Sequence, residues 1–229
     1  MKIGVLLSGN GVYDGSEIHE AVLSLLAIDE AGAEWICLAP NYNQHHVINH
    51  TNGQEMPETR NILIEAARIA RGNIKDIEGF DINEIDGLVM PGGFGAAKNF
   101  TQWAFKGPEG PINPAIKDFL IRMIQAGKPI AALCVSPVVL AKALEGSNIH
   151  PKLTLGTDKD PSPYDIKADS EGLAVMGAQP QMKTINEILV DEENKLISAP
   201  CYMMEVSIKE VRANAKMAID KLIEMTRSK

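Results

Sequence analysis

The stretch Lys128-Pro129-Ile130-Ala131-Ala132-Leu133-Cys134-Val135-Ser136-Pro137 decides the fold expected for this chain. An apolar run of strand length ends on Cys134, and a helical pattern follows at once, with Pro137 in its first turn, where proline is tolerated. Because almost no loop separates strand from helix, the turn must be sharp. The small residues Ala132 and Ser136 let the chain fold back. This is the geometry of a nucleophile elbow, although the serine-type consensus is not met.

Two interpretations of Cys134 follow from this stretch alone. A thiol at the N-terminus of a helix lies near unpaired backbone N–H groups and the positive end of the helix dipole, which favour the reactive thiolate. The alternative is a buried cysteine at the end of a strand, with no chemical role.

Strands alternate with helices along the rest of the chain. We expect strands at 2–7, 35–38, 87–90, 152–155, 187–190 and 195–198, and helices at 17–31, 59–71, 114–126, 137–144 and 207–227. Ser16 and Thr59 are the expected N-caps, and Ser207 with Glu210 forms a capping box. We expect an irregular insertion over 96–114, which covers a pocket or meets a partner subunit, and a loop over 158–170. The alternation predicts an α/β fold with a mostly parallel, doubly wound sheet.

Three motifs fall at the carboxyl ends of the expected strands, where such folds bind ligands. They are the glycine-rich segment 9–16, the segment Gly92-Gly93-Phe94-Gly95 and Cys134. Glycines there let backbone N–H groups approach a ligand, as in an oxyanion hole, although an ordinary tight turn has the same composition. Because all three motifs fall at the same edge of the expected sheet, we favour a functional role for Cys134 over a purely structural one.

Two glutamates lie near the start of the first helix. Glu20 stands at the edge of an apolar run, so we expect its carboxyl group to be partly buried and to need a partner. The alternative is a solvated glutamate favoured by the helix dipole. That alternative suits Glu17 better than Glu20. Between Ala21 and Ile28 only Ser24 is polar, so we expect this helix to be covered on most of its surface.

Composition limits the classes of partner and compartment. A net charge of −8 argues against nucleic acid or an anionic membrane as the main partner. The three cysteines, Cys37, Cys134 and Cys201, are widely spaced, and there is no signal-like or membrane-length apolar run. These features predict a reduced, cytoplasmic protein. The histidines at 45, 46 and 50 have no carboxylate or cysteine at ligand spacing, so we expect a polar loop or a wall of the site, and no metal.

Four segments carry a resemblance to a known family: Gly4–Gly11, Gly15–Glu20, Pro91–Asn99 and Ala132–Pro137, with a later one at 198–203. Together they resemble the ElbB family, the isoprenoid biosynthesis glyoxalase-like branch of the PfpI and class I glutamine amidotransferase-like superfamily. The resemblance spans the chain and implies a single domain over 1–229, a flavodoxin-like three-layer sandwich and a homodimer. It implies that Cys134 is hydrogen-bonded to an acidic residue, placed by alignment on Glu20. The implied activity is conversion of glyoxal to glycolate without glutathione, or a related protein deglycase activity.

One departure from better-studied relatives restricts the chemistry. They carry a histidine about twenty residues after the elbow cysteine, whereas 153–158 has none and His150 comes too early. No late His-x-Glu pair is present either, so we do not expect amidase or protease chemistry. The expected mechanism needs only two side chains. Cys134 adds to a small dicarbonyl, the N–H groups of Gly93 and Val135 hold the oxyanion, and Glu20 moves the proton, with no metal or cofactor.

Two other classes of function remain open at this point. An accessible cysteine also serves as a redox sensor, oxidised reversibly to sulfenic acid. A binding subunit that regulates a larger enzyme of isoprenoid metabolism is the other alternative. Turnover of glyoxal, oxidation by mild peroxide and co-purification of a partner distinguish the three.

Overall fold

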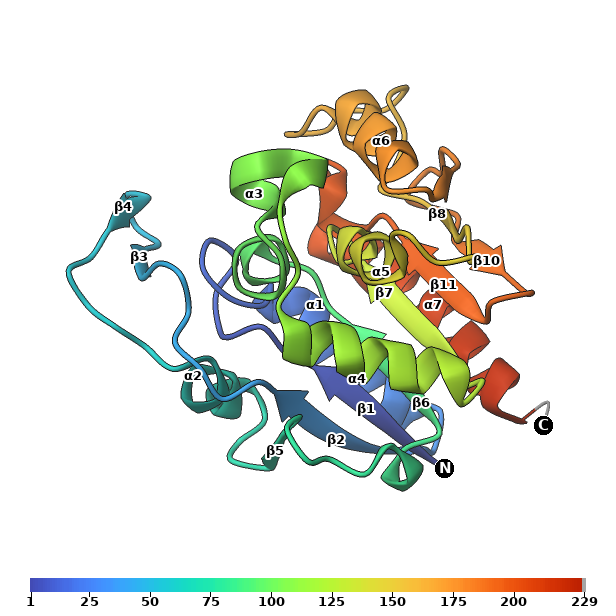
Figure 1. Cartoon of the computed structure of the whole chain (residues 1–229), viewed down its shortest axis with the longest axis horizontal. Coiled ribbons are helices and arrows are strands. Elements are labelled where there is room, and N and C mark those ends of the chain that lie inside the picture. The colour runs from blue at the N-terminus through green and yellow to red at the C-terminus, as the bar shows by residue number, and fades with distance from the viewer. Residues whose placement is uncertain (228–229) are drawn as a thin grey trace.

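Seven strands form the central sheet of the structure, a computed structural model that describes residues 1–227 (Figure 1). The order is β10-β11-β7-β6-β1-β2-β5, and β10 alone pairs antiparallel with its neighbour, β11. The strands are β1 (Lys2–Leu6), β2 (Glu34–Ala39), β5 (Ile74–Asp76), β6 (Gly87–Met90), β7 (Ile130–Leu133), β10 (Leu189–Asp191) and β11 (Leu196–Ala199). The strands expected at 187–190 and 195–198 are confirmed as the antiparallel pair β10 and β11. The mostly parallel sheet is also confirmed.

Helices cover both faces of the sheet and complete three layers. In Figure 1, α4 and α5 lie in front of the sheet and α1 and α7 behind it. The helices are α1 (Ile18–Glu30), α2 (Ile62–Ile69), α3 (Trp103–Lys106), α4 (Pro114–Gln125), α5 (Pro137–Leu144), α6 (Ile166–Val175) and α7 (Ile208–Arg227). The central strands β6, β7 and β11 are buried along their whole length. The sequences of β6 and β7 are apolar throughout, and the one polar residue of β11, Ser198, accepts a hydrogen bond from the Thr154 N–H (2.9 Å). The predicted α/β fold is confirmed.

Short elements decorate the edge of the sheet that carries the candidate motifs. The pairs β3 (Ile48–Asn49) with β4 (Gln54–Glu55) and β8 (Lys152–Leu153) with β9 (Gln179–Pro180) form two separate small sheets. The expected strand 152–155 is therefore shorter than predicted and lies outside the main sheet. A π-helix (Ala96–Phe100), α3 and a 3-10 turn (Gly107–Glu109) occupy the insertion that was expected to be irregular; further 3-10 turns are Ile82–Glu84 and Cys201–Met203.

The loop expected over 158–170 is wrong in its second half, because α6 begins at Ile166. Asp165 caps this helix by accepting a hydrogen bond from the Ala168 N–H (3.0 Å). The prolines of the expected loop, Pro161 and Pro163, lie before the cap, whereas Asp169 lies in the first turn of α6, where the helix dipole favours a negative charge.

Two of the expected N-caps are also wrong. Glu17, one residue after Ser16, caps α1 by accepting from the Glu20 N–H (2.7 Å), while the Ser16 hydroxyl accepts from the Ser8 N–H (2.8 Å). In α2 the cap is Asn61, two residues after Thr59. The capping box of α7 is confirmed, since the Ser207 N–H and hydroxyl both donate to the Glu210 carboxylate (2.9 and 2.6 Å).

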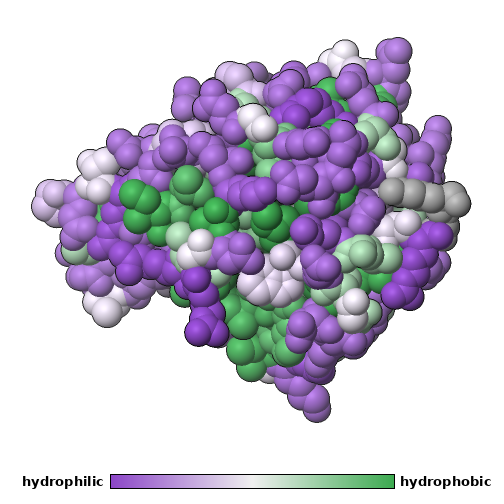
Figure 2. Space-filling view, turned by 90° about the horizontal axis from the view of Figure 1, so that it is seen from below, coloured by the Kyte–Doolittle hydropathy of each residue, from purple (hydrophilic) through white to green (hydrophobic). Residues whose placement is uncertain are grey.

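The surface of α1 is less covered than its apolar run suggests. Val22 is 48 % exposed and Leu26 is 41 % exposed, whereas Ala21, Ser24 and Ile28 are buried against the molecule. Figure 2 shows one face on which hydrophobic residues gather in patches among hydrophilic ones. Within residues 1–227 no helix combines the length and apolar character that a bilayer crossing demands.

Candidate active site

The turn between β7 and α5 holds Cys134 in a left-handed backbone conformation, with φ of 57°. This conformation is unusual for a residue with a side chain and stores strain on the order of 1–3 kcal/mol. The neighbouring chain fixes it: the Cys134 N–H donates to the Ala199 carbonyl (2.9 Å), and the Ser136 hydroxyl donates to the Pro91 carbonyl (2.7 Å). The sharp turn expected from the sequence is present.

Glu20 reaches the thiol from α1 and is completely buried. Its Oε2 accepts from the Gly92 N–H (2.7 Å), its Oε1 accepts from the Tyr202 N–H (3.2 Å), and its carboxyl group is hydrogen-bonded to Cys134. Burial, followed by the charge of Glu17, raises the pKa of Glu20 from near 4.5 to about 8. Glu20 therefore carries a proton at neutral pH. The expectation that it is buried beside a partner is confirmed.

The glycines of the β6 loop leave room for this pair. A Cβ atom on Gly92 would lie 2.4 Å from the Cys134 Cβ and 2.8 Å from a Glu20 carboxyl oxygen. Gly93 has φ of 98°, and a Cβ there would lie 2.4 Å from the Glu17 nitrogen. The N–H groups of Gly93 and Val135 both donate to the Cys134 sulfur. The structure thus brings together all five residues that the sequence proposed for the site.

The protonation of the thiol differs from expectation. Burial raises the pKa of the Cys134 thiol, the negative charge of Glu20 raises it further, and the N–H groups of Gly93 and Val135 lower it. Removal from water outweighs the helix N-terminus that the sequence emphasised. Cys134 and Glu20 are close enough for their titrations to be coupled. The loss of the first proton is therefore a property of the pair and cannot be assigned to one residue.

Glu17 is not the solvated residue that was expected. It is only 8 % exposed, because its N–H donates to the Gly92 carbonyl (2.8 Å) and the β6 loop covers it. Burial raises the pKa of its carboxyl group. Glu17 and Cys134 both line a cavity, whereas Glu20 lies behind Cys134 and outside the cavity wall. Sequence reasoning therefore missed a second carboxyl group of the site.

The cavity has a volume of about 350 Å³ and opens onto Cys134. The insertion at 96–114 was expected either to cover a pocket or to meet a partner subunit. It does cover the pocket, because residues of α3 and of the 3-10 turn after it form part of the cavity wall. The segment 164–172 forms an adjoining part of the wall, which the sequence missed because a loop was expected over 158–170. The principal side chains that sequence reasoning did not place at the site are Glu17, Phe94, Trp103, Tyr164, Asp169 and Tyr202.

None of the chain's histidines lines the described cavity. His19 is hydrogen-bonded to the Tyr202 hydroxyl (2.9 Å), at the rim. The rings of His45 and His46 pack against Phe105, with centroids 4.5 and 5.4 Å, respectively, from the centroid of its ring. His150 is hydrogen-bonded to the Gly177 carbonyl (2.9 Å). Over residues 1–227 no group of three or more histidine, cysteine or acidic side chains is arranged to hold a metal ion. The alternative expectation, that the histidines at 45, 46 and 50 form a wall of the site, is wrong for the described cavity, since His45 and His46 pack on the insertion instead.

Cys134 is expected to alkylate with iodoacetamide well before the other two cysteines. Cys134 is 5 % exposed and faces the cavity, whereas Cys37 and Cys201 are completely buried. Burial raises the pKa of all three thiols, so access through the cavity decides the order of reaction. Peptide mass spectrometry over a time course checks the order. Faster labelling of Cys37 would contradict the elbow assignment.

Gly92→Ala is expected to displace the Cys134 side chain, because the new methyl group overlaps both Cys134 and Glu20. Overpacking of this kind lowers the free energy of unfolding by about 1–3 kcal/mol. Urea denaturation measures that loss, and the rate of Cys134 alkylation reports the displacement. Gly146→Ala is the control for the alkylation rate alone: its methyl group meets no atom within 4 Å, but its φ of 77° makes the substitution itself destabilising. Equal alkylation rates in Gly92→Ala and the wild type would contradict the close packing.

Comparison with known proteins gives relatives along the whole chain, although no family model matches. The human glutamine amidotransferase-like class 1 domain-containing protein 3, mitochondrial, is 38 % identical over 227 residues, which cover 98 % of this chain and 83 % of that protein. The rat ES1 protein homolog, mitochondrial, is 35 % identical, covering 98 % and 84 %. The expected cytoplasmic localisation is contradicted by these relatives, which are named mitochondrial. Widely spaced, unpaired cysteines are typical of reducing compartments in general, and they do not distinguish one such compartment from another.

Solved structures agree with the fold. The isoprenoid biosynthesis protein with an amidotransferase-like domain from Ehrlichia chaffeensis superimposes with a TM-score of 0.88 at 35 % identity, covering 98 % of this chain and 99 % of that one. Drosophila melanogaster DJ-1beta superimposes with a TM-score of 0.53 at 17 % identity, covering 99 % and 95 %. At that identity the likeness concerns the fold alone.

Proposed function

Because the chain belongs to the family of ES1 and glutamine amidotransferase-like class 1 domain proteins, within the ThiJ/PfpI superfamily, we propose that it is a thiol-dependent enzyme. The proposed reaction is that of a glutathione-independent glyoxalase, which converts glyoxal-type dicarbonyls to hydroxy acids. One observation carries the proposal: a strained elbow presents Cys134 to a cavity while a protonated carboxyl group touches it from behind. The likeness to the Ehrlichia protein supports the narrower ElbB assignment, which is also part of the proposal.

The reaction begins from the pair with one proton removed, when the sulfur is a thiolate and Glu20 keeps its proton. The thiolate attacks one aldehyde carbon, and the carbonyl oxygen takes the negative charge. The N–H groups of Gly93 and Val135, which donate to the sulfur in the free protein, are placed to donate to this oxygen. The Glu20 proton then neutralises the oxygen and leaves a hemithioacetal and a carboxylate.

The carboxylate completes the chemistry by moving one proton between adjacent carbons. It removes the hydrogen from the carbon bonded to sulfur, which leaves an enediolate. The hydroxyl proton of the first carbon then moves to the oxygen of the second, and the protonated Glu20 returns the carried proton to the second carbon. The result is a thioester of the hydroxy acid. Water hydrolyses the thioester, which releases glycolate from glyoxal and restores the thiol. The sum is glyoxal plus water giving glycolic acid, with no external oxidant or reductant.

Two carboxyl groups are close enough to serve as the proton carrier. Glu20 is hydrogen-bonded to Cys134, so it lies beside any carbon that becomes bonded to the sulfur. Glu17 lines the cavity and therefore faces the rest of the substrate. We assign the transfer to Glu20 because its pKa of about 8 suits a group that both gives and takes a proton near neutral pH.

The test is to incubate the wild-type protein with glyoxal, without glutathione or added metal, and to follow the product by proton NMR in D₂O. We expect glycolate to form in proportion to protein concentration. Deuterium in its methylene group would report exchange of the carried proton with solvent. Absence of glycolate at substrate concentrations up to the millimolar range, with the protein folded, would overturn the glyoxalase proposal.

A regulatory thiol is the alternative that the family relation also allows. Peroxide and a dicarbonyl both react with the thiolate, so the raised pKa of Cys134 does not separate the two functions. The cavity of about 350 Å³ over Cys134 favours the enzyme, because peroxide needs no such space. The homodimer stays a prediction, which sedimentation equilibrium of the purified chain would check.

A further inference from the structure

The cavity over Cys134 is larger than the smallest dicarbonyl, glyoxal, requires. Its volume of about 350 Å³ falls within the range of pockets that enclose ligands with many more atoms. Most of its wall is aromatic or aliphatic, with Phe94, Trp103, Tyr164, Tyr202 and Met203 as the large side chains. A substrate that fills this space therefore has an apolar body beyond its reacting carbonyl group.

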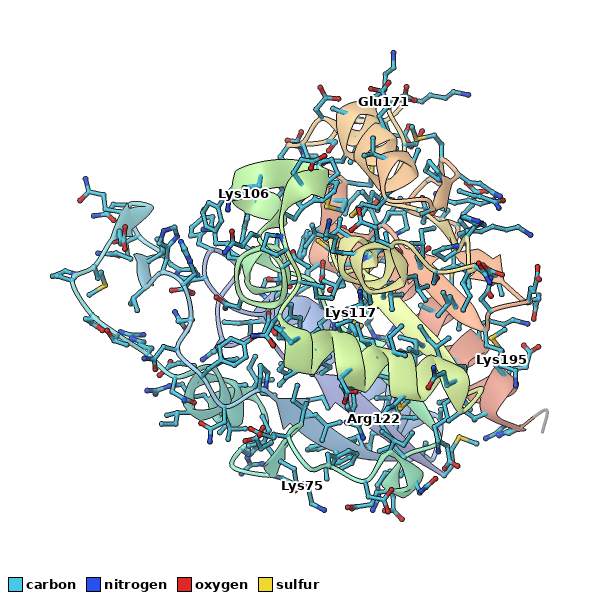
Figure 3. All side chains as sticks on the ribbon, in the orientation of Figure 1. Lys75, Lys106, Lys117, Arg122, Glu171 and Lys195 are labelled. Atoms are coloured by element: carbon cyan, nitrogen blue, oxygen red, sulfur yellow. The ribbon has the colours of Figure 1, made fainter. Side chains whose placement is uncertain are left out.

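Segments from distant parts of the chain hold the aromatic wall in place. The outer edge of the Trp103 ring of α3 packs on Gly172 of α6, where a Cβ atom would come within 2.5 Å of the indole. The Tyr164 and Phe94 rings meet edge to face, with centroids 6.2 Å apart. On the outer sides of the same helices, the charged residues Lys106 and Glu171 point to solvent (Figure 3). Contacts among α3, the segment 164–172 and the β6 loop thus fix the positions of the aromatic rings in the cavity wall.

The charged side chains of the wall are all acidic. Glu17 and Asp169 line the cavity, and burial raises the pKa of Asp169 to about 6, so it is ionised at neutral pH. Among the described lining residues there is no lysine or arginine. Two lysines contact wall residues from outside: Lys98 donates to the Tyr13 carbonyl and lies over the Phe94 ring, and Lys142 donates to the Pro108 carbonyl. An anion entering the cavity would meet negative charge without a cationic partner.

We infer that the cavity takes an uncharged α-oxoaldehyde with an aromatic or branched aliphatic body, and that it discriminates against carboxylate- or phosphate-bearing ligands. The carbonyl end meets Cys134 and the body packs against Trp103 and Phe94. Asp169 repels anions. The inference that the substrate is an α-oxoaldehyde depends on the proposed function. The inference that its body is uncharged and apolar depends only on the residues of the cavity wall.

The first experiment measures this preference without catalysis. The wild-type protein is alkylated with iodoacetamide, iodoacetanilide and 4-carboxyiodoacetanilide, and each second-order rate at Cys134 is divided by that of free N-acetylcysteine. We expect iodoacetanilide to react at least about tenfold faster than iodoacetamide, because its ring is buried on the wall. We expect the carboxylated reagent to react roughly tenfold more slowly than iodoacetanilide.

Two variants locate the preference. Trp103→Ala should remove most of the advantage of iodoacetanilide over iodoacetamide. Asp169→Asn should raise the rate of the carboxylated reagent several-fold and leave that of iodoacetamide unchanged. Asp158→Asn, which removes the same charge from an exposed residue outside the wall, is the matched control and should change neither ratio.

The second experiment compares turnover of phenylglyoxal with that of glyoxal, and we expect kcat/KM to be at least about tenfold higher for phenylglyoxal. Equal normalised alkylation rates for the three reagents, or a faster rate for the carboxylated one, would overturn the inference. Selective alkylation without turnover of either dicarbonyl would instead overturn the glyoxalase proposal and leave the preference for an uncharged apolar body supported.

Discussion

Cys134→Ala is expected to lose all measurable turnover of glyoxal while the protein stays folded. Every covalent step uses the sulfur, so its removal should lower kcat by at least about 10³-fold. The alanine keeps the left-handed turn and its strain, and the backbone hydrogen bond from residue 134 to Ala199 does not depend on the side chain. Product formation followed by NMR, together with urea denaturation, separates loss of chemistry from loss of fold.

Cys37→Ala is the matched control, because it removes a buried thiol from β2 and leaves the cavity intact. It should cost some stability and keep the activity. Cys134→Gly adds a further check: glycine adopts φ of 57° without strain, so its free energy of unfolding should exceed that of Cys134→Ala by about 1 kcal/mol. Turnover by Cys134→Ala at the rate of the wild type would show that the sulfur is not the nucleophile.

Glu20→Gln is expected to lower kcat by roughly 10²-fold or more, the usual scale for loss of a general acid–base. It should also lower the free energy of unfolding by about 1–3 kcal/mol. Both carboxyl oxygens of Glu20 accept backbone N–H bonds, from Gly92 and Tyr202, and an amide can accept only one of them. Loss of the carboxyl charge should also move the titration of the Cys134 thiol to lower pH, because that charge raises the thiol pKa.

Glu17→Gln is the comparison that identifies the proton carrier. The amide oxygen can still accept from the Glu20 N–H and cap α1, so we expect a stability change below about 1 kcal/mol. If Glu20 carries the proton, Glu17→Gln keeps most of the activity, and the Cys134 thiol titrates at the same pH as in the wild type. A large loss of kcat in Glu17→Gln with near-normal activity in Glu20→Gln would transfer the role to the glutamate that lines the cavity.

Much of the fold could be predicted because local patterns and tertiary structure agree. The apolar runs that become β1, β6 and β7 are buried in the sheet, and Pro137–Leu144 is helical over the range expected. The second half of the expected 158–170 loop was wrong because prolines and aspartates indicate both loops and helix starts. Only the contact of Gly172 with Trp103 explains a glycine within α6.

The site was harder to predict because its properties depend on contacts between distant segments. Glu17 has the position of a solvated first-turn glutamate, and only the β6 loop folded over it makes it a buried wall of the cavity. The helix N-terminus after Cys134 suggested a ready thiolate, but the extent of burial decides the pKa, and sequence does not reveal burial at this precision.

The protonated state of Glu20 links the folding equilibrium to hydrogen-ion activity. The unfolded chain releases this proton near pH 4.5, whereas the native state holds it to about pH 8, so between these values folding takes up one proton. The contribution of Glu20 to stability is therefore greatest in acid and falls by about 1.4 kcal/mol for each pH unit across this interval. Raising the pH from acid to about 8 thus lowers the free energy of unfolding through the same carboxyl group that serves the thiol.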